Sequence, residues 1–286
     1  MLTFARPDDR AELFHIWKQC FGDDDRYINF YFDTAFAPDQ TPVLRLNGTI
    51  AAMMRLFSCS LRVGEQVFPL QYVYAAATLP EFQGQGCMRR LMEEVGRYCA
   101  ARGDQGIVLI PGSMGLFGFY EKLGFSTRFY RRVENVRLNE QDLDADGVLT
   151  DLSFPEFLQM RREYAASFPA FVEHGEDLAR YVYKELHFSG GKMLKFQDKS
   201  GQSYGVCYMI GKKTALAESN ASGAARAAFL SALLREESAR SALSADYAPS
   251  RMEGAPYGML RCLSSRLSQA LEALPRAPYM GCMLDD

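Results

Sequence analysis

The chain has 286 residues, 48% of them hydrophobic, with a formal net charge of −3 and an isoelectric point near 5.8. The length predicts about two domains, and the slightly acidic balance disfavours nonspecific binding to nucleic acid. The seven cysteines form no Cys-x-x-Cys pair, which argues against a disulfide framework or a zinc site and favours a reducing cytoplasm. Early charges exclude a signal peptide, and no uncharged stretch reaches the ~20 residues of a membrane span. We therefore expect a cytoplasmic protein without metal, membrane or nucleic-acid contact.

The first forty residues predict a short strand and two helices. Residues 2–5 are typical of a strand, and the next apolar positions, Leu13 to Trp17, have helical spacing, with Asp8 or Asp9 as the candidate cap. The run Gly22-Asp-Asp-Asp25 ends that helix. An aromatic-rich segment, 27–36, predicts the second helix.

Three strands follow, over 42–47, 50–63 and 66–79. Asn47-Gly48 and Gly64-Glu65 lie between them, and Asn-Gly between apolar runs is a strong hairpin signal. Pro80 ends the third strand because proline has no N–H for a sheet ladder.

The turn after the third strand is the most informative feature of the chain. It reads Gln83-Gly84-Gln85-Gly86, and the helix after it carries Leu91, Val95 and Tyr98 on one face. A glycine turn before a helix presents unpaired backbone N–H groups and the positive end of the helix dipole, which together suit a pyrophosphate. The turn is neither a P-loop nor the dinucleotide fingerprint. Taken alone, it also fits an ordinary strand–helix connection.

A second motif follows a short predicted strand at 106–110. Residues 111–125 predict a short helix ended by Gly124 as its C-cap, and 126–138 predicts a further strand.

Together these two motifs resemble those of the GNAT superfamily of acyl-CoA-dependent N-acetyltransferases. Thr78 to Met88 is similar to its motif A, Val-x-Pro-x-x-(Arg/Gln)-x-x-Gly-x-(Gly/Ala), and Phe119-Tyr-Glu-Lys-Leu-Gly-Phe125 to the end of its motif B. The motifs stand in the family's order, with one helix and one strand between them. Met88 departs from the usual glycine or alanine, as in the subgroup of the enhanced-intracellular-survival acetyltransferases. Ser113 replaces the asparagine that often opens motif B.

The resemblance implies acetyl-CoA as cosubstrate and a set of residues that hold it. The strand end at 76–78 would hold the pantetheine and the acetyl carbonyl, the turn amides the pyrophosphate, and Ser113 the pantetheine arm or thiol. Tyr120 would be the general acid for the departing thiolate, with core packing as the alternative. The cofactor-binding residues expected in this way are Ala76, Ala77, Thr78, Gln83, Gly84, Gln85, Gly86, Cys87, Met88, Arg89 and Ser113.

The general base and the acceptor site are less defined. Strand 70–79 contains no Asp, Glu or His, so Glu65, Glu81, a water relay and a terminal carboxylate at Asp286 all stay open. The terminal carboxylate is a candidate because the similar enhanced-intracellular-survival proteins use a C-terminal carboxylate as their base. Asp23, Asp24, Asp25 and Glu81 are candidates for attracting the acceptor's ammonium group, with a solvated helix break as the alternative for the aspartates.

The second half predicts a degenerate repeat of the first. An acidic linker over 139–147 precedes helices at 153–168 and 176–187, strands near 191–197, 203–211 and 214–219, and a helix near 222–238. Two more strands are expected at 257–263 and 279–284. The turn Asn220-Ala-Ser-Gly-Ala224 lacks the Gln-x-x-Gly core. We therefore expect a mixed α/β fold, with a GNAT catalytic domain over 1–138 and a degenerate GNAT-like α/β domain over 148–286 that shapes the acceptor site or an interface.

The leading hypothesis is an acetyl-CoA-dependent N-acetyltransferase that acts on a primary amine of a small molecule or peptide by direct attack. One alternative is a Fem-like tandem aminoacyltransferase, which the acidic isoelectric point and the intact CoA motif disfavour. Another is a non-catalytic acyl-CoA-binding regulatory protein. The acceptor's identity and a homo-oligomeric state stay open, because acceptor loops vary freely in this fold.

Overall fold

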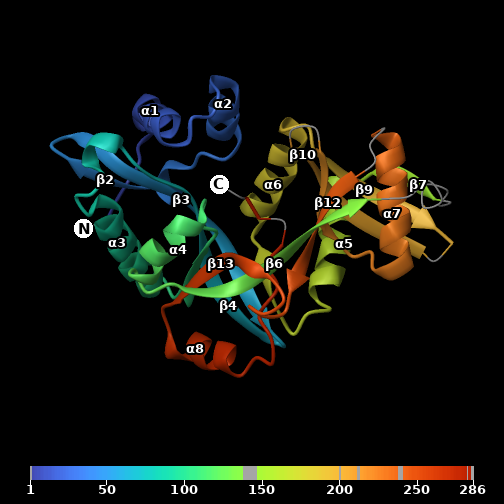
Figure 1. Cartoon of the computed structure of the whole chain (residues 1–286). Coiled ribbons are helices and arrows are strands. Elements are labelled where there is room, and N and C mark those ends of the chain that lie inside the picture. Colours follow the sequence, from blue (N-terminus) through green and yellow to red (C-terminus); the bar gives the residue numbers. More distant parts are fainter. Residues whose placement is uncertain are drawn as a thin grey trace.

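The computed structural model of the chain describes residues 2–137, 147–199, 201–210, 213–237, 241–281 and 283–284. These residues form a 13-stranded mixed sheet with helices against its faces (Figure 1). The mixed α/β architecture predicted from the sequence is confirmed.

The first half follows the predicted order of elements closely. Its elements are β1 (Thr3–Phe4), α1 (Arg10–Phe21), α2 (Asp25–Thr34), β2 (Pro42–Leu46), β3 (Thr49–Val63), β4 (Gln66–Thr78), α3 (Cys87–Ala101), β5 (Gly106–Leu109), α4 (Met114–Glu121) and β6 (Ser126–Arg137). Asn47 and Gly48 both have positive φ, as the tight turn between β2 and β3 requires. Asp9 precedes α1 as expected, but its carboxylate does not cap that helix. It accepts instead from the backbone N–H of Arg6 at 2.6 Å.

The second half contains the predicted helices and central strands, together with elements that the sequence did not indicate. Its elements are β7 (Val148–Asp151), α5 (Phe154–Ala165), β8 (Ala170–His174), α6 (Glu176–Phe188), β9 (Lys192–Asp198), β10 (Gly201–Ile210), β11 (Lys213–Ser219), α7 (Gly223–Glu236), β12 (Ser241–Ala248), β13 (Ala255–Cys262) and α8 (Ser265–Glu272). The strand expected at 279–284 is wrong: Tyr279 makes only an isolated bridge with Phe171.

The same arrangement of elements occurs in both halves. In the first, β2, β3 and β4 are antiparallel neighbours, and β5 lies parallel to β4 after the crossover helix α3. In the second, β9, β10 and β11 are antiparallel neighbours, and β12 lies parallel to β11 after α7. The sheet therefore contains two copies of one supersecondary unit, as the predicted repeat requires.

Beyond these two units, strands from one half pair with strands from the other. Strand β13 comes from the second half but pairs with β5 and β6 of the first, and β6 pairs with β12 of the second. Strand β8 also crosses over, because it extends the edge of β3 beyond the part paired with β2. The predicted linker over 139–147 lies almost wholly outside the described residues, and the division at that point stays a prediction. The shared sheet makes each half complete the other.

Two hydrophobic layers cover the first half's strands. One contains the apolar faces of α3 and α4, including Leu91, Val95 and Phe117. The other contains α1 and α2 and continues into α5 and α6 of the second half. The end of β4 contacts both layers, because Ala76 packs against the first and Ala77 belongs to the second.

Candidate active site

Strand β4 separates from β5 just before the predicted cofactor turn. The two strands pair from Leu70 and Gly106 to Val73 and Leu109, and the register ends there. Directly beyond, the β3–β4 ladder has an irregularity, and Ala75 adopts φ of 50°. A β-bulge of this kind bends a strand and ends pairing on one side. The backbone of the last residues of β4 is consequently not paired with β5.

The turn after β4 leaves an open space in front of the N-terminus of α3. Gly84 and Gly86 have φ of 74° and 78°, and no atom lies within 4 Å of where a Cβ would stand at either. The backbone N–H of Arg90 donates to Gly86 O at 3.0 Å. The preceding amides of the first turn have no i−4 partner within a helix. These amides form the positive end of the helix dipole, and the side chain of Arg89, in the same turn of the helix, is exposed.

The two glutamines of the turn fix its shape. Gln83 Nε2 donates to Thr78 O at 3.0 Å, and Gln85 Nε2 donates to Glu81 O at 2.7 Å. Both side chains are thus bonded back to the backbone that precedes the turn. The groups left to contact a ligand are the backbone amides.

Thr78 is the clearest indication that a ligand fits at the end of β4. Its Oγ1 is buried and has no hydrogen-bond partner among the described residues, while its carbonyl accepts from Cys20 Sγ at 3.3 Å as well as from Gln83. A buried hydroxyl without a partner costs about 1–3 kcal/mol. A polar group of a ligand lying along β4 would supply that partner, as would an amide of a pantetheine arm.

Tyr120 lies in α4, which packs on the same face of the sheet as α3, and Ser113 is the residue before this helix. Tyr120 is 8% exposed and makes edge contacts with Phe119 and Phe125 at ring-centre distances of 5.2 and 5.7 Å. Ser113 precedes the helix, is exposed, and makes no capping bond with its side chain. Packing therefore accounts for the ring of Tyr120, and the role of its hydroxyl stays a prediction.

A cavity of about 360 Å³ lies on the other side of β4, between the two halves. Its walls come from α2, β4, β6, α5, α6, β10, β11, β12, β13 and the C-terminal segment. Seven of its lining residues are tyrosines: Tyr27, Tyr74, Tyr130, Tyr164, Tyr208, Tyr257 and Tyr279. The hydroxyls of Tyr27 and Tyr74 are 3.2 Å apart. Three carboxylates, Glu185, Glu218 and Asp246, also line it.

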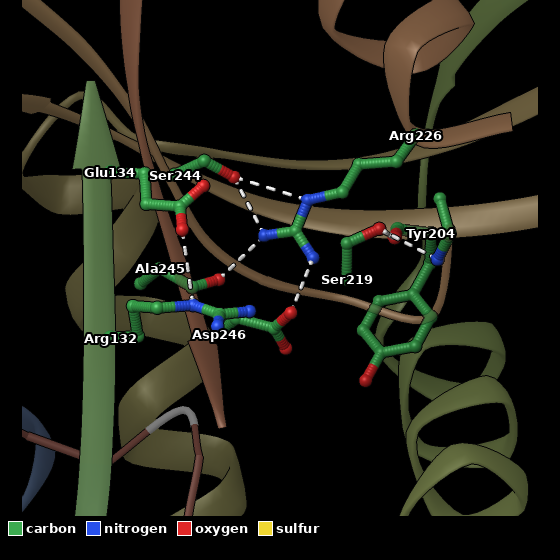
Figure 2. A network of polar contacts seen from close by, with 9 residues as sticks. Arg132, Glu134, Tyr204, Ser219, Arg226, Ser244, Ala245 and Asp246 are labelled. Carbon is green, nitrogen blue, oxygen red and sulfur yellow. Dashed lines mark hydrogen bonds and ion pairs between the residues drawn. The ribbon is translucent and has the colours of Figure 1, made fainter. Parts of the chain in front are cut away.

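Two of these carboxylates belong to ion pairs with arginine. Glu218 is 4% exposed, lies 3.2 Å from Arg161 Nε, and accepts from Tyr204 Oη at 2.7 Å and from Tyr279 Oη. Asp246 lies 3.1 Å from Arg226 Nη1. Figure 2 shows the Arg226 guanidinium between Ser244, the carbonyl of Ala245 and Asp246.

The turn of the second half that corresponds to the glycine turn contains the chain's own hydrogen bonds. Asn220 Oδ1 accepts from Tyr204 N at 2.8 Å, and Ser219 Oγ donates to Tyr204 O at 2.6 Å and accepts from Ala221 N at 3.0 Å. Figure 2 shows Ser219 beside Tyr204. Arg226, in the first turn of α7, reaches across to β12. The polar side chains of this turn therefore bond to β10 and β12, and the turn carries one glycine, Gly223, where the turn of the first half carries two.

The three aspartates predicted to attract the acceptor each have a partner within the chain. Asp23 Oδ2 accepts from Trp17 Nε1 at 2.7 Å, and Asp24 Oδ1 accepts from an amide of the first turn of α2 at 2.7 Å. Asp25 forms an ion pair with Lys18 at 2.9 Å. These contacts support the alternative that the three aspartates stabilise the break between α1 and α2. None of the three lines the cavity.

The candidate bases lie in different places. Glu65 is at the β3–β4 hairpin, about 40 Å along β4 from the cofactor turn at ~3.3 Å per residue, so its position does not suit the role. Glu81 is exposed beside the turn. Asp286 lies outside the described residues. Leu284, the last described residue, lines the cavity and accepts from Tyr72 Oη through its carbonyl.

Sequence reasoning missed the residues that line the cavity from both halves. Tyr74 carried a signal, because the alternation of strand 70–79 places it on the face opposite Val73. Tyr27 and Glu185 carried none, since only the packing of α6 against α2 brings them together. Among the described residues, no group of His, Cys, Asp and Glu is arranged to hold a metal ion, and no helix is long and apolar enough to cross a membrane.

Residues 3–128 match the family model described as "Acetyltransferase (GNAT) domain". No curated protein matches the chain.

Solved structures show the same fold over nearly the whole chain. A GCN5-related N-acetyltransferase from Anabaena variabilis ATCC 29413 is 15% identical, with a TM-score of 0.74, over 92% of this chain and 73% of that one. Eis1 from Mycobacterium abscessus is 13% identical, with a TM-score of 0.67, over 94% and 75%. A conserved protein of unknown function from Enterococcus faecalis V583, described as a probable N-acyltransferase, is 12% identical, with a TM-score of 0.69, over 92% and 72%. At these identities the likeness concerns the fold.

Proposed function

We propose that this chain is an acetyl-CoA-dependent N-acetyltransferase acting on a primary amine, because residues 3–128 match the model of a GNAT acetyltransferase domain. The single observation that carries the proposal is the break between β4 and β5. It leaves the end of β4 open on one edge, next to the glycine turn and the buried Oγ1 of Thr78. These groups fit the pantetheine and the pyrophosphate of acetyl-CoA.

In this proposal, the first-turn amides of α3 bind the pyrophosphate and the backbone at 76–78 orients the acetyl carbonyl. The acceptor amine approaches from the cavity on the other face of β4. Its nitrogen attacks the carbonyl carbon and the C–S bond breaks. The Tyr120 hydroxyl donates its proton to the departing sulfur, and the proton lost by the amine passes to a base.

Asp286 is the base we propose, supported by the position of Leu284 two residues earlier in the cavity wall. Glu81 and a water relay are the alternatives. The second half completes the acceptor cavity in this proposal and binds no CoA, because its turn at 220–224 lacks the Gln-x-x-Gly core.

The experiment that tests this proposal is calorimetric binding of CoA to the Gly86→Glu variant. The new carboxylate would enter the open space in front of α3 and repel a phosphate, so we expect binding to be abolished. Gly103→Glu is the matched control, because Gly103 also has positive φ, 93°, with open space around it, at the other end of α3. Both variants carry the same backbone strain of ~1–2 kcal/mol. Unchanged affinity in Gly86→Glu would remove the CoA assignment.

A non-catalytic acyl-CoA-binding protein is the second candidate, favoured by the full packing around Tyr120. Release of CoA thiol from acetyl-CoA against a panel of amines separates the two functions. A protein that binds acetyl-CoA tightly but releases no thiol with any amine would be a binding protein.

A further inference from the structure

Glu185 brings a negative charge from the second half to the first half's side of the cavity. It lies in the last turn of α6, is half-buried, and lines the cavity together with Tyr27 and Tyr74. Its Oε1 accepts from the Ser189 hydroxyl at 2.8 Å. Aromatic packing fixes this part of α6 against α2, with Phe188 stacked on Phe30 at 4.1 Å between ring centres.

The negative charge of Glu185 acts on the phenol of Tyr27. Burial raises the pKa of Tyr27 to about 12, and the Glu185 carboxylate contributes to that rise. The phenol therefore stays protonated at neutral pH, with its hydroxyl 3.2 Å from that of Tyr74. A carboxylate and two phenols that line the same cavity are a suitable environment for one ammonium group.

The rest of the cavity disfavours a second positive charge. Glu218 and Asp246 are ion-paired with Arg161 and Arg226. Arg131 lines the wall, with its guanidinium 4.2 Å from the ring centre of Tyr257. The remaining walls are rings and aliphatic side chains, including Leu216, Leu243 and Met283. A ligand with several positive charges would meet the guanidinium of Arg131 in the wall.

Resting on the proposed function, we infer that the acceptor is a primary amine with a single positive charge and a flat aromatic body. Glu185, with the hydroxyls of Tyr27 and Tyr74, binds its ammonium group. Tyr74 lies three residues before Ala77 in β4, which is about 10 Å along a strand. Tyr74 thus lies on the same strand as the backbone that orients the acetyl group. Glu185 is a substrate-binding residue in this proposal. The separate base takes one proton from the ammonium group before the free amine attacks, and the proton that the nitrogen loses after the attack restores the Tyr120 hydroxyl.

The test measures binding of 2-phenylethylamine to the CoA-saturated protein by calorimetry. Its neutral counterpart 2-phenylethanol and the polycation spermidine are the comparison ligands. We expect 2-phenylethylamine to bind more tightly than both. Glu185→Gln should weaken 2-phenylethylamine about tenfold or more and leave 2-phenylethanol unchanged.

Glu176→Gln is the matched control. Glu176 is an exposed glutamate in the first turn of the same helix, paired with Arg180, and its substitution should have no effect on either ligand. The inference fails if spermidine binds better than 2-phenylethylamine, or if Glu185→Gln has no more effect than Glu176→Gln. CoA affinity is measured in the same samples. Intact CoA binding with failed amine selectivity overturns only this inference, whereas absent CoA binding overturns the proposed function.

Discussion

His174 links the stability of the two halves to pH. It lies in β8, opposite Cys59 of β3 in the sheet, and both of its ring nitrogens are buried. Burial lowers the pKa of His174 well below its usual range, the Arg161 guanidinium lowers it further, and the backbone of Gly281 acts in the opposite direction. The imidazole is therefore neutral in the folded protein.

The magnitude follows from proton linkage. The unfolded chain takes up a proton at this site below pH ~6.5, whereas the folded chain does not. Stability is fully present above that pH and falls as the pH is lowered. At pH 5 protonation of this histidine stabilises the unfolded state by about RT ln(1 + 10^1.5), or ~2 kcal/mol, and at pH 7.5 it stabilises that state by almost nothing.

The assay is urea denaturation at pH 7.5 and pH 5 for the natural chain, His174→Gln and His187→Gln. His187 is exposed on α6 and serves as the control. The free energy of unfolding should decrease from pH 7.5 to pH 5 in all three proteins. We expect this decrease to be about 2 kcal/mol smaller in His174→Gln than in the natural chain. His187→Gln should keep nearly the natural decrease. Equal decreases in all three proteins would refute the reasoning.

Three further predictions concern the active site. Tyr120→Phe should lower turnover about 100-fold with little change in CoA affinity, as expected for loss of a general acid, and Tyr98→Phe on α3 should have little effect; natural turnover in Tyr120→Phe would make it a packing residue. Removal of Asp285 and Asp286 should collapse turnover while the fold, followed by circular dichroism, is unchanged; retained turnover would transfer the role to Glu81 or water. Saturation calorimetry should give about one CoA per chain, and two equivalent sites would contradict the proposal that only the first half binds CoA.

The sequence by itself determined the features that depend on short stretches of chain. Three such features are the glycine turn at 83–86, the amphipathic helix α3 and the hairpins of β2 to β4. Each follows from the conformational freedom of glycine or from the spacing of apolar residues within about twenty positions. For the same reason, the two motifs and their order led to the family, and residues 3–128 do match its domain model. The candidate CoA site consists largely of such local elements: the residues predicted for it at 76–89 lie in the end of β4, the turn after it and the start of α3, whereas Ser113 precedes α4.

Only the tertiary structure decided how the second half completes the first. Strand β13 was predicted as a strand, but no local pattern indicates that it lies between β5 and β6. The segment 279–284 has the composition of a strand, yet it packs irregularly in the cavity wall, with Leu284 bonded to Tyr72. Glu185 lies more than one hundred residues from Tyr74 along the chain. Pairing and packing over such separations depend on the fit of distant surfaces, which local propensity does not contain, so the acceptor cavity became visible only in the folded chain.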